Sequence, residues 1–217
     1  MADSIHTSVT PDEKIIATLT PGSVVTYNAE TQEFSAINHE VMVFGSTPGQ
    51  TISISRDGEL TAVTGFAGTY PYIYQTTDLP AGHRKLIPAV PYTTKDSACA
   101  FGAKGQKIYV GNDDGWVRVF DVASGEELPD EAWKAHQSEV TAIAVSQEGD
   151  IVATAGGPST ILWSTELKPD QARGSRIILN TGPHSRNWLH FTTGDTCLIH
   201  AAPEDPFQHW DAPSQKD

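Results

Sequence analysis

Cysteine is scarce in this sequence, with Cys99 and Cys197 the only two among 217 residues. Two cysteines are too few for the disulfide framework that stabilises many small secreted domains. No asparagine begins an Asn-x-Ser/Thr glycosylation site. The N-terminus also lacks the basic region and apolar core of a signal peptide. These absences predict an intracellular protein, either cytoplasmic or nuclear.

Long apolar runs and basic clusters are also missing. No apolar run approaches the roughly 20 residues of a membrane-spanning helix, so membrane insertion is not expected. Lys and Arg total 14 against 27 Asp and Glu, which gives a formal net charge of −13. Because an acidic protein repels phosphate backbones, nucleic acid is not expected as a direct ligand. The acidity either serves solubility or favours a partner with a basic surface.

What the sequence does contain is an internal repeat. An aromatic anchor ends a β-rich run in each unit, and successive anchors are 47, 46, 43 and 47 residues apart: Tyr27, Tyr74, Phe120, Trp163 and Trp210. A turn position upstream of each anchor keeps spacings of 45, 47, 44 and 45 residues: Glu13, Gly58, Gly105, Gly149 and Gly194. Short β-rich runs between tight turns indicate antiparallel meanders. Two independent landmarks with nearly the same period predict five similar units.

This pattern resembles the WD-repeat family, whose period is about 40–45 residues with four strands per repeat. The resemblance is best over residues 102–166, which contain DGWVRVFD and HQSEVTAIAVSQEGDIVATAG, with His136 in the family's histidine position. It implies an all-β propeller of four-stranded antiparallel blades, five of them visible, in a single domain over residues 1–217. The expected blade units are approximately residues 4–38, 39–86, 87–130, 131–180 and 181–217.

The sequence also departs from the family pattern. The family often links a His, a Ser/Thr, an Asp and the Trp by buried hydrogen bonds within one blade. The fourth unit has His136, Thr154 and Trp163, but Gly157-Pro158 stands where the Asp is expected. No unit is complete. Because blades are held mainly by stacking their apolar faces, the fold is expected to survive without the full network.

The last unit ends after its third strand, near Trp210-Asp211, so the last blade is expected to be incomplete. An unpaired strand edge is normally paired or covered. Three arrangements remain open. The chain could form a five-bladed ring with a short last blade, or an open propeller completed by strands of a partner. It could also be a fragment of a larger, seven-bladed WD-repeat protein.

Candidate catalytic groups are missing from the innermost strands, where enzymatic propellers place them. The expected innermost strands contain no Asp or Glu: residues 5–10, 50–55, 97–101, 140–146 and 188–193. Acid–base catalysis by paired carboxylates is therefore not expected. The spacings of the C-terminal histidines with Cys197 match no compact zinc motif, and no Gly-rich run fits a phosphate loop. The sequence predicts no enzyme, no metal and no cofactor.

Binding residues are expected in the loops of the third and fourth units. Trp116, Arg118 and Trp133 are of the types enriched at interface hot spots, and Asp113 and Asp114 precede Trp116 in an acidic turn. Both tryptophans could instead fill gaps between blades. The expected function is a protein–protein interaction scaffold that presents propeller loops to partners in a multi-subunit assembly, one of which could complete the last blade. The alternative is a five-bladed lectin-like or small-ligand-binding propeller.

Overall fold

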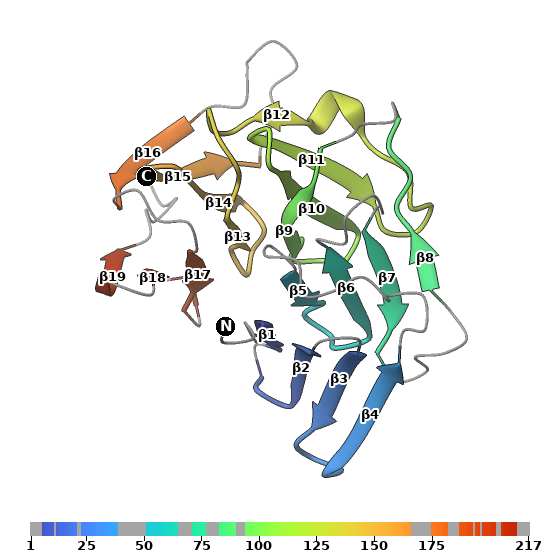
Figure 1. Cartoon of the computed structure of the whole chain (residues 1–217). Coiled ribbons are helices and arrows are strands. Elements are labelled where there is room, and N and C mark those ends of the chain that lie inside the picture. Colours follow the sequence, from blue (N-terminus) through green and yellow to red (C-terminus); the bar gives the residue numbers. More distant parts are fainter. Residues whose placement is uncertain are drawn as a thin grey trace.

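The fold is an all-β propeller of five blades arranged around a common centre (Figure 1). This confirms the predicted fold class. The computed structural model describes residues 6–10, 12–20, 23–38, 51–64, 71–76, 83–89, 94–165, 175–181, 187–192, 194–195, 197–202 and 205–211. Over these ranges, no helix is both long enough and apolar enough to cross a membrane.

The first two blades each contain four antiparallel strands, which follow chain order from the innermost strand outward. Blade 1 consists of β1 (His6–Val9), β2 (Ile15–Thr20), β3 (Ser23–Asn28) and β4 (Glu33–Asn38). Blade 2 consists of β5 (Thr51–Ile54), β6 (Leu60–Thr64), β7 (Tyr72–Gln75) and β8 (His83–Lys85).

Blades 3 and 4 also have four strands each. Blade 3 consists of β9 (Asp96–Phe101), β10 (Lys107–Asn112), β11 (Trp116–Asp121) and β12 (Trp133–Lys134), with the short 3-10 helix η1 (Pro129–Glu131) before β12. Blade 4 consists of β13 (Ala142–Val145), β14 (Ile151–Gly156), β15 (Ser159–Ser164) and β16 (Ser175–Asn180). The expected unit of residues 131–180 therefore begins with a two-residue strand that pairs with β11 of the preceding sheet.

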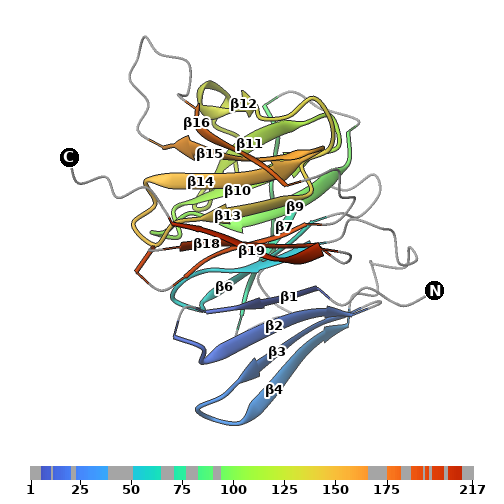
Figure 2. The same cartoon turned by 90° about the vertical axis from the view of Figure 1, so that its left-hand side faces the viewer.

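Blade 5 has three strands within the part of the chain that the structure describes, in agreement with the predicted incomplete last blade. They are β17 (Trp188–Phe191), β18 (Cys197–Ala202) and β19 (Asp205–Asp211). Figure 2 views the side of the molecule on which blade 5 lies between blade 4 and blade 1.

The turn between the two innermost strands of each blade has the same backbone geometry. The residue whose N–H bonds to the oxygen three residues earlier takes a positive φ in every blade: Glu13 (59°), Gly58 (75°), Gly105 (65°), Gly149 (79°) and Asp195 (54°). The sequence predicted Gly194 for blade 5, which lies one residue earlier and also has a positive φ, 80°. In four blades a hydroxyl group that follows the innermost strand accepts a hydrogen bond from the first N–H of the second strand. The accepting residues are Thr10 (3.1 Å), Ser55 (2.9 Å), Ser146 (3.0 Å) and Thr192 (3.0 Å). Blade 3 has Gly102 at this position and keeps only the backbone bonds.

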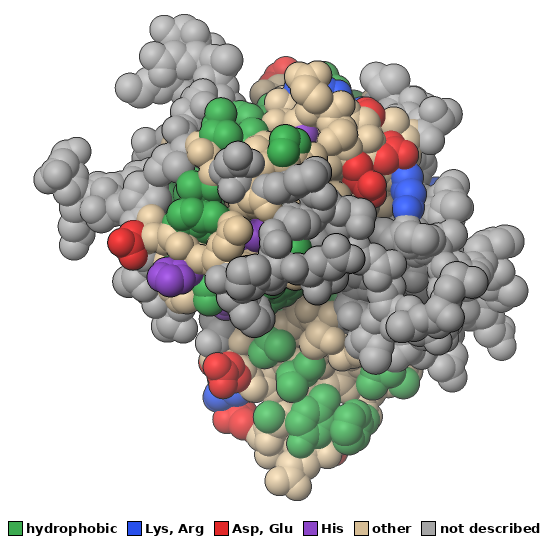
Figure 3. All heavy atoms as spheres, turned by 60° about the vertical axis from the view of Figure 1, so that its left-hand side comes forward, with side chains coloured by type: hydrophobic (Ala, Val, Ile, Leu, Met, Phe, Trp, Pro, Cys, Tyr) green, Lys and Arg blue, Asp and Glu red, His purple; other side chains and the backbone are tan. Residues whose placement is uncertain are grey.

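The hydrophobic core lies between consecutive blades. Four clusters of buried apolar residues join blade 1 to 2, 2 to 3, 3 to 4 and 4 to 5. The aromatic anchors Tyr74, Phe120 and Trp163 are buried in the first three clusters, and Trp210 packs against the fourth. Among the described residues, no such cluster joins blade 5 to blade 1. Apolar side chains of blade 1 are instead visible at the surface, in the lower part of Figure 3.

The innermost strands of all five blades line one central cavity of about 960 Å³. Arg56 and Gln147 lie in the turns that follow β5 and β13, at one mouth of this cavity. Arg56 Nη1 donates a hydrogen bond to the backbone oxygen of Gln147 at 2.6 Å. This contact connects blade 2 with blade 4 across the mouth.

Candidate functional site

The predicted acidic turn of blade 3 is held firmly by the backbone around it. Asp113 Oδ1 accepts a hydrogen bond from Lys95 N–H at 3.1 Å, and Asp113 N–H donates to Lys95 O at 2.9 Å. Asp114 Oδ1 accepts from Trp116 N–H at 3.1 Å. Gly115, with φ +84°, has its oxygen bonded to the N–H groups of Ala135 and His136 at 2.9 and 3.1 Å. The turn is thus fastened to the strands on both sides.

Of the two predicted tryptophans, Trp116 is the one that lies at the surface, with 37% of its surface exposed. It begins β11 and pairs with Lys134 of β12. The Lys134 ammonium donates to the Asp114 backbone oxygen, and Asp113 is exposed on the same turn. We call Asp113, Asp114, Trp116 and Lys134 the blade 3 rim. Lys134 was not among the predicted residues, because only the strand pairing brings it next to Trp116.

Arg118 does not belong to this rim. It lies on β11, and its Nη1 forms a 3.0 Å ion pair with Glu127 Oε1. The Glu127 side chain is 1% exposed and that of Arg118 is 19% exposed. Glu127 Oε2 also accepts the Ala89 N–H at 2.8 Å, which ties the segment after blade 2 to blade 3. Arg118 therefore has an ion-pair partner inside the chain, and its use in partner binding stays a prediction.

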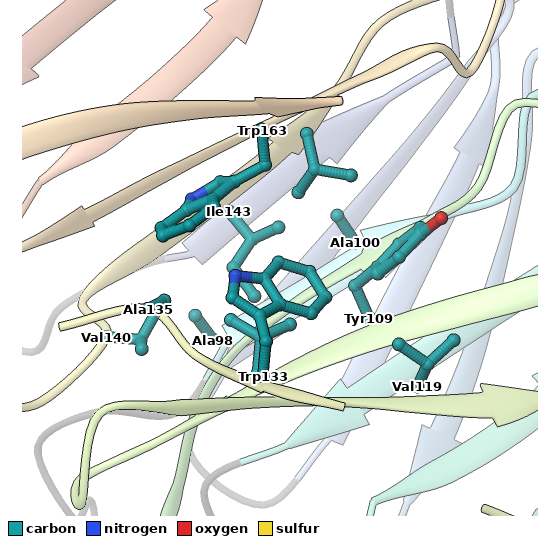
Figure 4. Packing of buried hydrophobic residues seen from close by; sticks show 11 residues of the cluster. Ala98, Ala100, Tyr109, Val119, Trp133, Ala135, Val140, Ile143 and Trp163 are labelled. Carbon is teal, nitrogen blue, oxygen red and sulfur yellow. The ribbon is translucent and has the colours of Figure 1, made fainter. Parts of the chain in front are cut away.

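Trp133 is also unsuited to the predicted partner contact, since only 7% of it is exposed. Its indole packs edge-on against Trp163 and Tyr109, with ring centroids 5.8 and 6.2 Å apart (Figure 4). The cluster around it contains residues of blade 3, such as Val119, and of blade 4, such as Ile143. Trp133 fills the gap between these blades, which is the second interpretation that the sequence allowed.

His136 forms a buried hydrogen-bond network within blade 4. Its Nε2 lies 2.9 Å from Thr154 Oγ1, and Trp163 Nε1–H donates to the same oxygen at 2.9 Å. Gly156 supports the network because an added Cβ there would lie 2.6 Å from His136 Cγ. Three members of the expected network are therefore assembled, although Gly157-Pro158 replaces the fourth.

This network predicts a pH dependence of stability. Burial lowers the pKa of His136 below its usual 6.5, and backbone hydrogen bonds to Thr154 and Gly156 oppose the shift only partly. The unfolded chain then takes up a proton at a higher pH than the folded chain. The contribution of His136 is fully present above about pH 6.5 and is lost as the pH falls through the lowered pKa, with a slope of at most about 1.4 kcal/mol per pH unit.

Urea unfolding between pH 7.5 and 5 would measure this effect. We expect the free energy of unfolding to fall less steeply below pH 6.5 in His136→Gln than in the unaltered chain, because glutamine does not titrate. Groups that titrate elsewhere contribute equally to both proteins and cancel in the difference. Parallel curves for the two proteins would contradict the prediction.

The central cavity offers little to acid–base or nucleophilic chemistry. The expectation that no innermost strand contains an acid is wrong at one position, because β9 begins one residue earlier, at Asp96. Asp96 is buried and its Oδ1 accepts from Asn112 Nδ2 at 2.6 Å. Glu13 and Glu139 line the cavity, but one follows an innermost strand and the other precedes one, so they lie at opposite mouths. Burial raises the pKa of the Cys99 thiol to about 12, which keeps it protonated at neutral pH.

One equivalent position of the innermost strands, beside the cavity, has a small residue in four blades and a histidine in the fifth: Ser8, Ser53, Ala100, Ala144 and His190. The lectin-like alternative predicts equivalent polar and aromatic residues once per blade, and the small residues at this position do not supply them. Over the described residues, which exclude His184, no three His, Cys, Asp or Glu side chains are grouped so that they could hold a metal ion.

A family model described as "WD domain, G-beta repeat" matches residues 129–164. This range contains the outer strand of blade 3, the first three strands of blade 4 and the whole His136 network. A comparison with curated proteins finds no match. The matched repeat and the five-bladed fold together show that the chain is a divergent WD-repeat β-propeller.

Proposed function

We propose that this chain is a protein–protein interaction scaffold, which presents the blade 3 rim to a partner in a multi-subunit assembly and carries out no covalent chemistry. WD-repeat propellers are typically interaction scaffolds and are generally non-catalytic. The observation that carries the proposal is the position of Trp116, which is partly exposed on a turn fastened by hydrogen bonds. A large aromatic side chain on a pre-ordered backbone loses little conformational entropy when a partner covers it.

The charged residues of the rim would orient the partner. Asp113 is exposed beside Trp116, whereas Lys134 is held by the turn. Because the whole chain carries a formal charge of −13, a partner with a basic surface would also associate faster and more selectively. We place this assembly in the cytoplasm or nucleus, where Cys99 and Cys197, both free, stay reduced.

A second contact of the same scaffold would lie at the outer edge of blade 5. The fifth sheet ends at β19 within the described residues, whereas the other four sheets have a fourth strand. The backbone groups on the free side of such an edge can pair with an added strand from another chain. We propose that a partner strand completes blade 5 in this way.

Affinity purification with matched variants would test the proposed use of the rim. Trp116→Ala combined with Asp113→Lys should reduce the recovery of specific partners at least about tenfold, because truncating a hot-spot tryptophan typically costs 2 kcal/mol or more. Lys104→Ala is the control, since Lys104 is exposed on a blade 3 turn at the other end of the strands. Equal recovery with all three proteins, at unchanged thermal stability, would refute the use of the rim.

A further inference from the structure

The segment that leads from blade 3 into blade 4 is bonded to the turn of the blade 3 rim. We call this segment, residues 133–140, the connector; it begins with β12 and leads into β13. The N–H groups of Ala135 and His136 both donate to Gly115 O, at 2.9 and 3.1 Å. The turn that carries Asp113 and precedes Trp116 therefore shares its backbone hydrogen bonds with the repeat of the next blade.

Close packing joins the connector to the turn as firmly as these bonds do. An added Cβ at Gly115 would overlap His136 O and would lie 2.7 Å from Ser138 O. Val140 N–H donates to Asn112 O at 3.0 Å, and the same oxygen accepts Gly115 N–H at 3.1 Å. Because no side chain fits between the turn and the connector, a movement of the connector must also move the turn.

The side chain of His136 holds the connector to blade 4. Its Nε2 lies 2.9 Å from Thr154 Oγ1 of β14, and both residues are buried. The next glycine along this strand, Gly156, lets the connector approach closely, since an added Cβ there would lie 2.6 Å from His136 Cγ and 2.8 Å from Glu139 O. The imidazole thus lies between the connector and blade 4 and contacts both.

Trp163, the aromatic anchor of blade 4, supports the connector by two routes. Its Nε1–H donates to Thr154 Oγ1 at 2.9 Å, the oxygen that also binds His136. Its ring packs edge-on against Trp133, the first residue of the connector, with ring centroids 5.8 Å apart (Figure 4). The next residue, Lys134, donates to the backbone oxygen of Asp114 in the rim turn. Both routes lead from the core of blade 4 to the rim of blade 3.

The family's usual partner for this histidine is replaced in this chain. The WD-repeat pattern places an Asp in the turn between the second and third strands, where this chain has Gly157-Pro158. A carboxylate of that turn therefore does not hold the imidazole, and the bond to Thr154 together with the close contact at Gly156 sets its position. This departure makes the connector depend on the single shared oxygen of Thr154.

We propose that His136 is a positioning residue of the blade 3 rim. Its bond to Thr154 holds the connector against the rim turn, so that Trp116 and Asp113 are presented to a partner in one arrangement. The binding surface lies on blade 3, but its geometry is set from blade 4. The inference rests on the proposed scaffold function and adds to it how the binding surface is kept in place.

The titration of His136 distinguishes this role from packing alone. Burial lowers the pKa of His136 below its usual 6.5, so the imidazole takes up a proton more readily once the connector opens. Opening should therefore become easier as the pH falls below about 6.5, by at most about tenfold per pH unit, until the pH passes the lowered pKa. Strands β14 and β15 contain no charged residue, and the charged residues of the connector and the turn are Lys134, Glu139, Asp113 and Asp114. His136→Gln keeps all of these groups, so it isolates the imidazole.

Amide hydrogen exchange of the whole chain, followed by NMR, would test the proposal. The reporters are the four amides whose hydrogen bonds close the turn or join it to the connector: Gly115, Ala135, His136 and Val140. The references are the amides of Gly105 and Val122, which are bonded at the opposite end of the blade 3 strands. Thr154→Val removes the shared oxygen and leaves the connector unaltered. Thr160→Val is the matched control, because Thr160 is equally buried on the adjacent strand and its Oγ1 forms no hydrogen bond with the described residues.

We expect Thr154→Val to lower the protection of the reporter amides at least about tenfold, because a buried imidazole loses its hydrogen-bond partner and the connector opens locally. The reference amides should change by less than about threefold, and Thr160→Val should leave both sets unchanged.

The pH profile is the second readout, and it decides the matter if Thr154→Val does not fold. In the unaltered chain, reporter protection should fall between pH 7 and pH 5 after correction for the intrinsic exchange rate. In His136→Gln, whose amide group can bond Thr154 but does not titrate, reporter protection should not change over this range.

Three results would overturn the proposal. Equal reporter protection in Thr154→Val and Thr160→Val would mean that the turn keeps its shape without blade 4. Equal losses at reporters and references would mean that the network stabilises the whole chain and does not position the rim. The same pH profile in His136→Gln and in the unaltered chain would remove the imidazole from the coupling. No partner takes part in these measurements, whereas the scaffold function is tested by partner recovery with rim variants, so the two failures are distinguishable.

Discussion

Replacing Glu127 with alanine is expected to lower the free energy of unfolding by about 3–5 kcal/mol, because it removes one member of a buried ion pair. The Glu127 side chain is 1% exposed and binds both Arg118 Nη1 and the Ala89 N–H. The substitution would leave the Arg118 charge without this carboxylate in a site that is 19% exposed. Urea unfolding followed by circular dichroism would measure the loss.

The neighbouring Glu126 supplies the control. It is exposed and its side chain takes part in no ion pair that the structure shows within the described residues, so Glu126→Ala should change stability by less than about 0.5 kcal/mol. Glu127→Gln keeps a hydrogen-bond acceptor but loses the charge. Its loss of unfolding free energy should therefore lie between the losses for Glu127→Ala and Glu126→Ala. A loss below about 1 kcal/mol for Glu127→Ala would show that Arg118 finds another partner or water, and that this ion pair contributes little to stability.

Trp133→Ala is expected to cost about 3–5 kcal/mol, because it leaves a cavity between blades 3 and 4. The indole is buried to 7% exposure and contacts both Tyr109 and Trp163 edge-on, and such aromatic pairs add to the energy of burial. Trp163 is held by its hydrogen bond to Thr154 and by its packing against Trp133. When Trp133 is removed, this packing loosens, and the near-ultraviolet circular dichroism of the folded variant should lose intensity.

Trp116→Ala is the matched control, because Trp116 lies on β11, the strand that pairs with the strand of Trp133, but is 37% exposed. It should change the free energy of unfolding by less than about 1 kcal/mol. The two tryptophans would thus separate stability from binding: Trp133 affects folding, and Trp116 affects the proposed partner contact. Equal destabilisation by the two substitutions would contradict this assignment.

The sequence predicted the repeat well, because the signals of the repeat are local. A residue with positive φ recurs at each turn from Glu13 to Asp195, one residue after the predicted Gly194, and an aromatic anchor lies near the end of the third strand of every blade. It missed the recurring hydroxyl at Thr10, Ser55, Ser146 and Thr192, although the period of this position can be read from the printed sequence. The predicted inner strand of blade 3 began at residue 97, whereas β9 begins at Asp96. This difference of one residue is why Asp96 was not predicted on an innermost strand.

The sequence did not predict which of the candidate residues are accessible. Trp116 and Trp133 were equivalent candidates, yet only Trp116 reaches the surface, and Arg118 is paired with a glutamate nine residues away. Burial depends on which strands become neighbours, and the pairing of β12 with β11 places the two tryptophans, whereas the segment before β12 brings Glu127 to Arg118.

The sequence by itself determined that the chain folds into five similar antiparallel blades with one aromatic anchor each, because turn geometry and strand alternation depend on residues close together in the chain. Only the tertiary structure decided which anchors are covered. Trp163 and Tyr27 occupy the same position in their repeats, but Trp163 is buried against blade 3, whereas Tyr27 lies beside Phe34, which is 73% exposed. Stacking between blades is a contact between distant parts of the chain, so its presence or absence depends on the ring as a whole.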